Sequence, residues 1–397
     1  MDASSEQIRR VIEGLGAFAS FGTDPELWET IQRPESCDFV FGNPHDMPQP
    51  GYVEALMAAA KPTGPLHYAY TMDLPEATAA IAQGLTDRFG LGFRAEDVHM
   101  TNGNFSGLAM VLRAVADPGD EVVFVSPPWF FYESLIVASG AAPVRVYADR
   151  ETFDLDLSAI ADAVTERTRA IIVNSPNNPS GRIYPPSTLD ELARILHEAS
   201  ERNGRRIYLL SDEAYNRIIF DGREFPTPVA HYHHSFLLYT YAKTLLSPGS
   251  RLGYVATPPG MAEAEDLRLP LLVSQIATGW AFAASLLQHA VPELERLPGN
   301  MPALHARRDA LVPVLRDQGY DLIEPEGTFY VLVRSPLADD GAFCAILNSH
   351  DVYVLPGSTF EMPGWFRISL TASDDMVERA IPGFAKAIAE ASAEASG

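Results

Sequence analysis

The sequence has few cysteines and few basic residues. Only Cys37 and Cys344 occur among 397 residues, so we expect no disulfide framework, and a reducing compartment fits this composition. Lysine and arginine together number 29 against 52 acidic residues, which gives a formal charge of −23. Because nucleic-acid-binding proteins need a basic surface, this balance argues against a nucleic-acid partner.

Long apolar runs are also missing. No stretch approaches the roughly 20 apolar residues that a membrane-spanning helix needs. The beginning, MDASSEQIRRVIEGLG, lacks the apolar core and cleavage site of a signal peptide. Hydrophobic residues make up 47% of the chain and charged residues 20%, which is typical of a folded globular protein. We therefore expect a soluble cytoplasmic protein without a membrane partner.

The middle of the chain alternates apolar strand-like runs with helical patterns. The predicted strands are EVVFVS (121–126), VRVYA (144–148), AIIVNS (170–175), IYLLSD (207–212), FLLYTY (236–241) and LGYVA (252–256). The clearest helix, 187–204, has a capping signal in Ser187 and Asp190 and a stop at Gly204. Continuously apolar strands separated by helices indicate an α/β fold with a mostly parallel sheet covered on both faces.

The pattern changes after about residue 290. Predicted helices at 301–317, at 339–349 and from 374 alternate with strand-like runs at 327–334, 352–357 and 365–370. This is an α+β pattern, and the chain is long enough for two domains. We expect an N-terminal arm (1–45) that packs on the small domain, a large domain (46–290) and a small C-terminal domain (291–397).

Several residues that can carry chemistry fall at the ends of the predicted strands. Since open α/β sheets bind ligands at the carboxyl ends of their strands, we expect one crevice to collect the Asn102-Gly103-Asn104 turn, Trp129, an asparagine of PNNPSG (176–181), Asp212 and Lys243. Each has a simpler interpretation as a turn, a helix cap or a core ring. Together, with an anion-binding helix N-terminus after the TNGN turn, they require a ligand with an anionic group, a flat ring, a basic ring nitrogen and an aldehyde. Pyridoxal 5′-phosphate has all four.

A metal site is not expected. The HYHH run at 231–234 is the one histidine cluster, and it has no cysteine or acidic partner at ligand spacing.

The chain resembles the class I/II aminotransferases, which have fold type I among the pyridoxal-phosphate enzymes. The resemblance rests on NSPNNPSGRIY, SDEAYNRIIFDG, YAKTLLSPGSRLGYVA, PEGTFYVLV, VLPGSTF and FRISL, which follow the order of the family and cover about residues 40 to 390. It implies a large domain with a mostly parallel seven-stranded sheet between helices and a smaller α+β domain.

The resemblance also implies roles in cofactor binding and catalysis. Lys243 would form the aldimine with the cofactor and move the proton. Asp212 would face the pyridine nitrogen, and Tyr215 with Asn178 would face the phenolic oxygen. Trp129 would stack on the ring.

The phosphate and the substrate would be held by further residues. The phosphate ligands would be Gly103, Asn104, Thr240 and Arg251. Arg367 would clamp the α-carboxylate of the substrate, and Gly42 would line the substrate side together with Asn178 and Trp129. Tyr70, or alternatively Tyr68, would reach the cofactor of a neighbouring subunit, which implies a homodimer with shared active sites.

Two positions depart from the family pattern. Ala242 precedes the lysine where the family commonly has serine, and Phe105 follows the phosphate turn. The expected activity is transfer of the amino group of an L-amino acid to a 2-oxo acid. Another reaction of the same cofactor (a lyase, decarboxylase, synthase or amino acid oxidase) is the alternative, since one fold supports many reactions. A non-catalytic relative is disfavoured by the complete set of lysine, aspartate and arginine.

Overall fold

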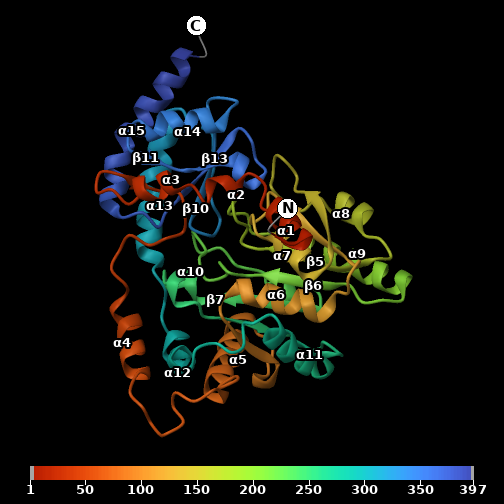
Figure 1. Cartoon of the computed structure of the whole chain (residues 1–397). Helices are drawn as coiled ribbons and strands as arrows, with labels where there is room; N and C mark the ends of the chain where they lie inside the picture. Colours follow the sequence, from red (N-terminus) through yellow and green to blue (C-terminus); the bar gives the residue numbers. More distant parts are fainter. Residues whose placement is uncertain (1–3, 395–397) are drawn as a thin grey trace.

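A computed structural model describes residues 4–394, and a seven-stranded sheet forms its centre (Figure 1). The strand order is β2-β8-β7-β6-β5-β3-β4. All neighbours pair in parallel except β8, which runs antiparallel to both β2 and β7. The strands are β2 (Val98–Thr101), β3 (Glu121–Ser126), β4 (Ala142–Tyr147), β5 (Thr168–Asn174), β6 (Tyr208–Asp212), β7 (Ser235–Thr240) and β8 (Gly253–Ala256).

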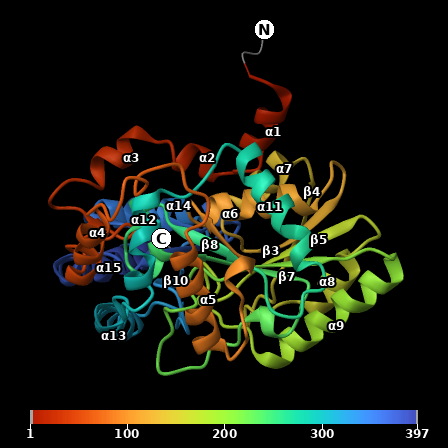
Figure 2. The ribbon, with the colours of Figure 1, turned by 90° about the horizontal axis from the view of Figure 1, so that it is seen from below.

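Helices cover both faces of this sheet (Figure 2). On one face lie α6 (Asn104–Val115), α7 (Tyr132–Ser139) and α11 (Ala264–Ala277), and on the other lie α8 (Leu157–Ala163) and α9 (Pro186–Asn203). Alternate residues of one strand serve the two layers, since Phe124 belongs to the core under α6 and Val123 to the core under α9. Burial on both faces explains why the strands are continuously apolar, and it confirms the predicted α/β fold.

The start of α9 differs from its prediction. The helix begins at Pro186 and no side chain caps it, so Ser187 lies inside the first turn rather than at the N-cap. A proline in the first turn lacks only an N–H that would have no partner there anyway. The helix can therefore begin at Pro186, with Pro185 at the N-cap and Ser187 one residue further on. The predicted stop is confirmed, because Gly204 ends the helix in the left-handed conformation with φ 62°.

The small domain has its own antiparallel sheet in the order β12-β13-β10-β9. Its strands are β9 (Leu322–Ile323), β10 (Tyr330–Arg334), β12 (Leu355–Pro356) and β13 (Trp365–Ser369), and its helices are α13 (Met301–Asp317), α14 (Asp340–Asn348) and α15 (Asp374–Glu394). Phe343, Phe366 and Phe384 are fully buried between the sheet and these helices. The predicted α+β character of the C-terminal part is therefore confirmed.

The first residues contact both domains. Helix α1 (Glu6–Glu13) packs on α7 of the large domain, where Ser134 Oγ donates a hydrogen bond of 2.9 Å to the carbonyl of Val11. Further along, β1 (Cys37–Asp38) pairs with β11 (Val352–Tyr353) of the small domain. The expectation that the whole arm packs on the small domain therefore fails for α1, whose neighbours belong to the large domain. Between them lie α2 (Phe18–Phe21) and α3 (Pro25–Thr30).

The expected division at residue 290 falls inside α12 (Ser285–Leu294). This helix packs against α4 (Pro50–Ala59) and α5 (Pro75–Phe89), and its Val291 is fully buried in their core. We therefore propose that the large domain ends after α12. Short 3-10 helices complete the chain: η1 (Ala95–Asp97), η2 (Pro228–Ala230), η3 (Pro248–Ser250) and η4 (Gly357–Phe360).

Cys37 and Cys344 are both free and buried. No helix within residues 4–394 is long and apolar enough to cross a membrane.

Candidate active site

A pocket opens where the parallel strands of the large sheet end. About 510 Å³ inside it is free of protein atoms, counting space open to solvent, which is within the range of small-molecule sites. Its lining residues are Asn104, Phe105, Trp129, Asn174, Asn178, Asp212, Ala214, Tyr215, Thr240, Ala242, Lys243 and Arg251. Most of the residues expected at this edge are therefore brought together.

Lys243 enters the pocket directly after a central strand. Strand β7 ends at Thr240, whose side chain caps the single-turn helix α10 (Tyr241–Thr244) by accepting from the backbone N–H of Ala242. The Lys243 Nζ lies 5.8 Å from the centre of the Tyr215 ring and 5.6 Å from that of Phe329. Ala242 contributes only a methyl group to the pocket wall, so no hydroxyl stands at this position.

The start of α6 and Arg251 form one end of the pocket. Because β8 runs antiparallel to β7, the beginning of β8 lies beside the end of β7. Arg251, two residues before β8, therefore contacts the turn that precedes α6. A Cβ atom at Gly103 would lie 2.7 Å from Arg251 Nη2 and 3.5 Å from Thr240 Oγ1, and φ here is 82°. Only glycine suits this close approach and this backbone conformation.

This end of the pocket suits an anion. No side chain caps the twelve-residue helix α6, so its first N–H groups face the pocket without a capping acceptor. Arg251 donates to the carbonyls of Pro248 and Asn102, at 2.9 and 3.3 Å, and to no carboxylate. Burial lowers the pKa of Arg251. The helix dipole, a guanidinium and the Thr240 hydroxyl thus converge where an anionic group would be stabilised.

Asp212 lies at the bottom of the pocket and is 5% exposed. Its Oδ1 accepts from Asn104 Nδ2 at 2.7 Å and from the Ala214 N–H at 3.3 Å, and its Oδ2 accepts from Tyr132 Oη at 2.6 Å. Burial raises the pKa of Asp212, while the hydrogen bonds from Tyr132, Ala214 and Asn104 act in the opposite direction. The protein therefore supplies donors that favour the carboxylate in an otherwise unfavourable environment.

Arg367 forms the other side of the site and is 2% exposed. Its Nη1 donates to Asn178 Oδ1 at 2.8 Å and its Nη2 to the carbonyl of Val40 at 3.1 Å, and Nε has no partner in the described structure. Burial lowers the pKa of Arg367. The guanidinium carbon lies 3.8 Å from the centre of the Tyr330 ring. A buried guanidinium without a carboxylate partner is suited to bind a carboxylate from outside.

Two tyrosines lie between Arg367 and Lys243. Burial raises the pKa of Tyr215 well above its ordinary value, and neighbouring Tyr330 adds to this. Burial acts to raise the pKa of Tyr330 as well, but Arg367, Lys243 and a hydrogen bond with Tyr215 together bring it below its ordinary value. Gly42 lies against the same ring, because a Cβ atom there would be 2.9 Å from Tyr330 Oη.

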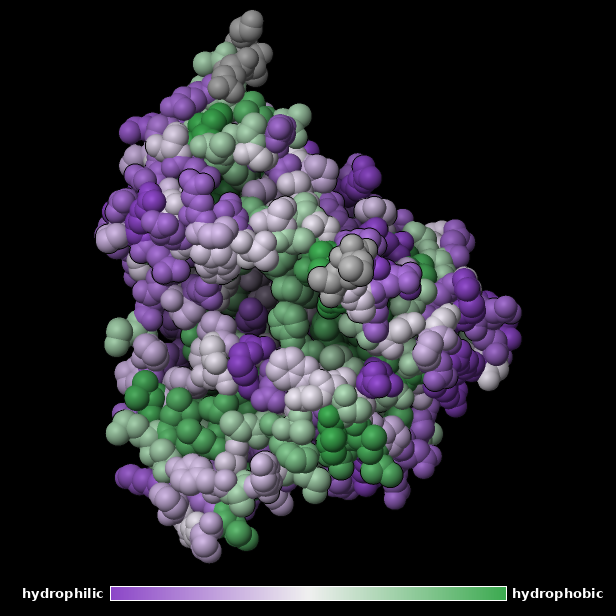
Figure 3. Space-filling model, viewed as in Figure 1, coloured by the Kyte–Doolittle hydropathy of each residue, from purple (hydrophilic) through white to green (hydrophobic). Residues whose placement is uncertain are grey.

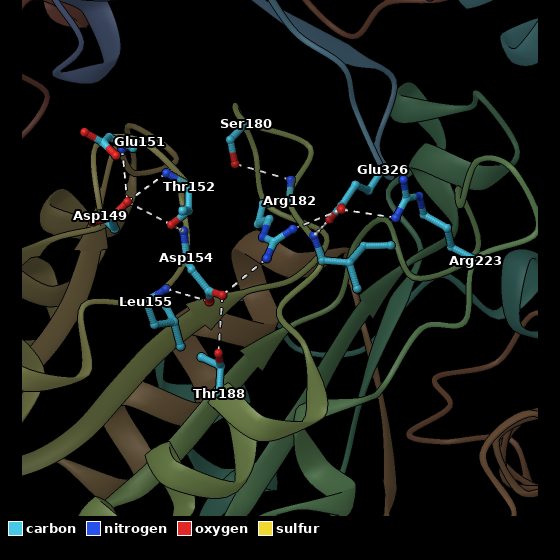
Figure 4. A network of polar contacts seen from close by, with 11 residues as sticks. Asp149, Glu151, Thr152, Asp154, Leu155, Ser180, Arg182, Thr188, Arg223 and Glu326 are labelled. Carbon is cyan, nitrogen blue, oxygen red and sulfur yellow. Dashed lines mark hydrogen bonds and ion pairs between the residues drawn. The ribbon is translucent and has the colours of Figure 1, made fainter.

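An ion-pair network fixes the turn that carries Asn178 (Figure 4). Arg182 lies between Asp154 and Glu326, with contacts of 3.3 and 3.0 Å, and Arg223 reaches Glu326 from the other side. Glu326 also accepts from the backbone N–H of Ile183 at 2.8 Å. Since Glu326 precedes β10 of the small domain, the network ties the Asn178 turn of the large domain to the sheet that carries Arg367.

Sequence reasoning missed three residues of the site. Tyr132 binds Asp212, Asn174 binds both the Asp212 carbonyl and the Asn178 N–H, and Tyr330 lies under Arg367. Asn174 is the last residue but one of the predicted strand 170–175 and the last residue of β5, a position that could have identified it. Tyr70, by contrast, is fully exposed and does not line the pocket of its own chain. Tyr68 donates its hydroxyl to the carbonyl of Ala60.

Histidines of the HYHH run pair with single carboxylates, His231 with Asp190 and His234 with Glu263. Within residues 4–394, no group of three or more histidine, cysteine, aspartate or glutamate side chains is arranged to hold a metal ion.

A lysine and an aspartate at the carboxyl edge of this sheet, with an anion site and a carboxylate site on either side, define an enzyme of amino-acid chemistry. The family model described as "Aminotransferase class I and II" matches residues 38–384, so the chain belongs to the class I and II aminotransferases. The protein is thus an aminotransferase, and the predicted family, fold class and enzyme class are confirmed. Members of this family use pyridoxal phosphate and act on amino and oxo acids.

Among curated relatives, the aspartate/prephenate aminotransferase of Thermus thermophilus is 32% identical over 355 residues, which cover 87% of this chain and 89% of the relative. The aspartate aminotransferase of Streptomyces avermitilis is 29% identical over 409 aligned positions, and the match covers 96% of this chain and 97% of the relative. Among solved structures, an amino transferase from Eubacterium rectale has a TM-score of 0.88 at 29% identity and covers 98% of this chain and 99% of its own.

Proposed function

We propose that this aminotransferase binds pyridoxal 5′-phosphate in the pocket between β7 and α6, with Lys243 as its covalent anchor. The observation that carries the proposal is the convergence of Lys243, buried Asp212 and the anion-binding end at Gly103 and Arg251 in one cavity. Asn104 Oδ1 is buried there without a partner. This donor set fits the phosphate, the ring nitrogen and the aldehyde of the cofactor.

The assigned roles follow from position. The N–H groups at Gly103 and Asn104, the Thr240 hydroxyl and Arg251 hold the phosphate. Trp129 would pack on the ring, and Asp212 would keep the ring nitrogen protonated. The hydroxyl of Tyr215 and the amide of Asn178 would bind the phenolic oxygen.

When bound, the cofactor supplies an electron sink for the electron pair left at the substrate Cα. Lys243 Nζ would act as the base that takes the Cα proton of the substrate. Arg367 holds the α-carboxylate through its planar fork and so orients the Cα–H bond toward Lys243. Asn178 bonds Arg367, so it couples the clamp to the cofactor side.

The two substrates are an L-amino acid and a 2-oxo acid. Both carry the carboxylate that Arg367 recognises, so a single clamp serves both half-reactions. Trp129 lines the space beside it, and Gly42 lets the N-terminal segment lie close to Phe329 and Tyr330, because a Cβ atom there would come within 2.9 Å of both side chains.

A homodimer completes the site. Large apolar side chains are exposed on α4, on the following loop and on α11, including Met57, Leu66 and Leu269, which are 65%, 76% and 66% exposed. Figure 3 shows apolar surface over α4 and α11 in the lower part of the molecule. Patches of this kind mark association surfaces. Tyr70 lies on the loop after α4 and is fully exposed, and its hydroxyl bonds no residue in the described part of the chain, so it would be the tyrosine that reaches the partner's phosphate site.

The chain has only three lysines, Lys61, Lys243 and Lys386, which makes a direct test possible. The purified enzyme should show a visible cofactor band, and borohydride reduction should attach the cofactor to the Lys243 peptide alone. Lys243→Ala should lose the label and the activity, and Lys386→Ala, changed at an exposed lysine of α15, should keep both. Label on Lys386, or full activity without Lys243, would refute the proposal.

The same preparation separates transamination from the alternative reactions. Turnover of an amino acid should require a 2-oxo acid acceptor. Sustained turnover without an acceptor would instead support a lyase, a decarboxylase or an oxidase on the same scaffold.

A further inference from the structure

A second pocket adjoins the site and shares Trp129 with it. About 490 Å³ inside it is free of protein atoms, counting space open to solvent, and Phe360 lines its other wall. The Phe360 ring lies 6.0 Å from the guanidinium carbon of Arg367. An amino acid held by its carboxylate on Arg367, with its Cα at Lys243, would therefore direct its side chain between Trp129 and Phe360 into this pocket. This placement rests on the proposed function.

The inner wall of the second pocket is aromatic. Phe130 lines it, and the ring of Phe18 stacks on Phe130 with centres 3.7 Å apart. Phe131 contacts Phe130 and Trp129 at 4.8 and 5.1 Å. Because these rings hold one another in place, the wall is preorganised for flat or branched apolar groups. The arm also lines this pocket, with Leu15 and with the small residues Gly16 and Ala17, and a Cβ atom at Gly16 would meet nothing within 4 Å.

The charges of this pocket disfavour an acidic side chain. Its one lining cation, Arg145, donates to Glu133 and pairs with Glu361 at 2.8 Å. Ser126 Oγ donates to the same Glu361 oxygen at 2.8 Å. Glu13 adds a third carboxylate to the lining. Among the described residues, this pocket therefore has no free cation that could bind the side-chain carboxylate of a substrate. It has three carboxylates that would repel one.

We propose that the amino-acid substrates of this enzyme carry large uncharged side chains, aromatic or branched apolar, and that aspartate is a poor substrate. Trp129, Phe130 and Phe360 then select the side chain, and the Arg145 cluster rejects a second carboxylate. Burial of an aromatic group in such a pocket corresponds to a preference on the order of 100-fold in kcat/KM over aspartate. The curated Thermus thermophilus relative is named for aspartate and prephenate, and both carry a second carboxylate, so the inference separates this chain from both substrates in that name.

The test uses the cofactor-loaded enzyme and a single half-reaction, because this needs no knowledge of the acceptor. The bleaching of the cofactor band is followed with phenylalanine, leucine, alanine, lysine and aspartate. Binding of 3-phenylpropionate and of succinate, which lack an amino group, is measured by calorimetry as an independent readout. Phenylalanine and leucine should react fastest, and 3-phenylpropionate should bind at least tenfold more tightly than succinate.

Two variants locate the preference in this pocket. Ala17→Phe fills it, and should lower the phenylalanine-to-alanine rate ratio about tenfold. Glu361→Gln removes one of the two carboxylates that pair with Arg145, so the aspartate-to-phenylalanine rate ratio should rise about tenfold. Glu198→Gln, an exposed carboxylate change on α9, should leave both ratios unchanged.

The outcomes are distinct. If aspartate or lysine reacts fastest, or if Ala17→Phe and Glu361→Gln leave the ratios unchanged, the inference is wrong while the proposed function stands. If no amino acid alters the cofactor band, the proposed function fails and the inference fails with it.

Discussion

Tyr132→Phe tests how the protein keeps Asp212 ionised. Among residues 4–394, the Tyr132 hydroxyl is the only donor to Asp212 Oδ2, because Asn104 and the Ala214 N–H both donate to Oδ1. Burial raises the pKa of Tyr132 well above its ordinary value, so the hydroxyl keeps its proton and remains a donor. A hydrogen bond to a buried charge is worth about 1.5–3 kcal/mol.

The sign follows from which form the bond favours. Tyr132 stabilises the carboxylate, so its removal raises the pKa of Asp212 further, and the carboxylate is lost on acidification at a higher pH. At about 1.4 kcal/mol per pKa unit, the acid limb of kcat/KM should move up by roughly one to two pH units. At a pH on this acid limb, a shift of one to two units lowers kcat/KM about 10- to 100-fold.

The assay is the pH dependence of kcat/KM at saturating cofactor, with thermal unfolding measured alongside. Tyr232→Phe is the matched control. It removes another buried hydroxyl, which donates to the carbonyl of Ile207 at 2.7 Å beneath α9, outside the pocket lining. Both variants should lose about 1 kcal/mol or more of stability, and only Tyr132→Phe should shift the acid limb. Equal pH profiles for the two variants would refute the reasoning.

Three further changes probe the clamp, a buried carboxyl and the network between the domains. Arg367→Lys keeps the charge but loses the fork, so KM for the amino acid should rise roughly 100-fold with the cofactor band intact; an unchanged KM would contradict the clamp. Burial raises the pKa of Glu213 from 4.5 to about 7 against three side-chain hydrogen bonds that lower it. The folded state therefore holds this proton to a higher pH than the unfolded chain, and stability is lost as the pH rises through about 7. In denaturant unfolding, Glu213→Gln should be more stable than the parent by up to roughly 3 kcal/mol at pH 9 and equal to it near pH 4; the opposite trend would exclude this assignment. Glu326→Gln weakens the bond to Arg182 and should lower kcat/KM several-fold by loosening the Asn178 turn, whereas Glu324→Gln, at an exposed pair with Arg316, should have no effect.

The sequence predicts the central strands well, because burial on both faces leaves a continuous apolar run. The predicted strand 121–126 coincides with β3, and 236–241 differs from β7 by one residue at each end. Strand β2 escaped prediction because it has only four residues, and its place in the sheet depends on pairing with β8 far along the chain.

The site was predictable where a residue lies at the end of a strand, as Asp212 does, or within three residues of it, as Lys243 does. The roles of Tyr132 and Tyr330 could not be predicted, because tertiary packing determines where their side chains point. Tyr132 reaches Asp212 only through the position of α7, and Tyr330 reaches Arg367 only because β10 pairs with β13. The side-chain bond of Asn104 to Asp212 was missed for the same reason, since the sequence suggested only a backbone role for this residue.

The pairing of β2 with β8 has a consequence for how the protein is made. Residues 98–101 cannot pair until residues 253–256 of the 397-residue chain have been synthesised, and Arg367 emerges from the ribosome later still. Contacts between such distant segments form late and slow folding. During synthesis, β2 therefore stays unpaired until β8 is made, which is a stage at which nascent chains associate wrongly. A polypeptide released before residue 367 would have no complete clamp, so the ability to convert an amino acid distinguishes finished chains from interrupted ones.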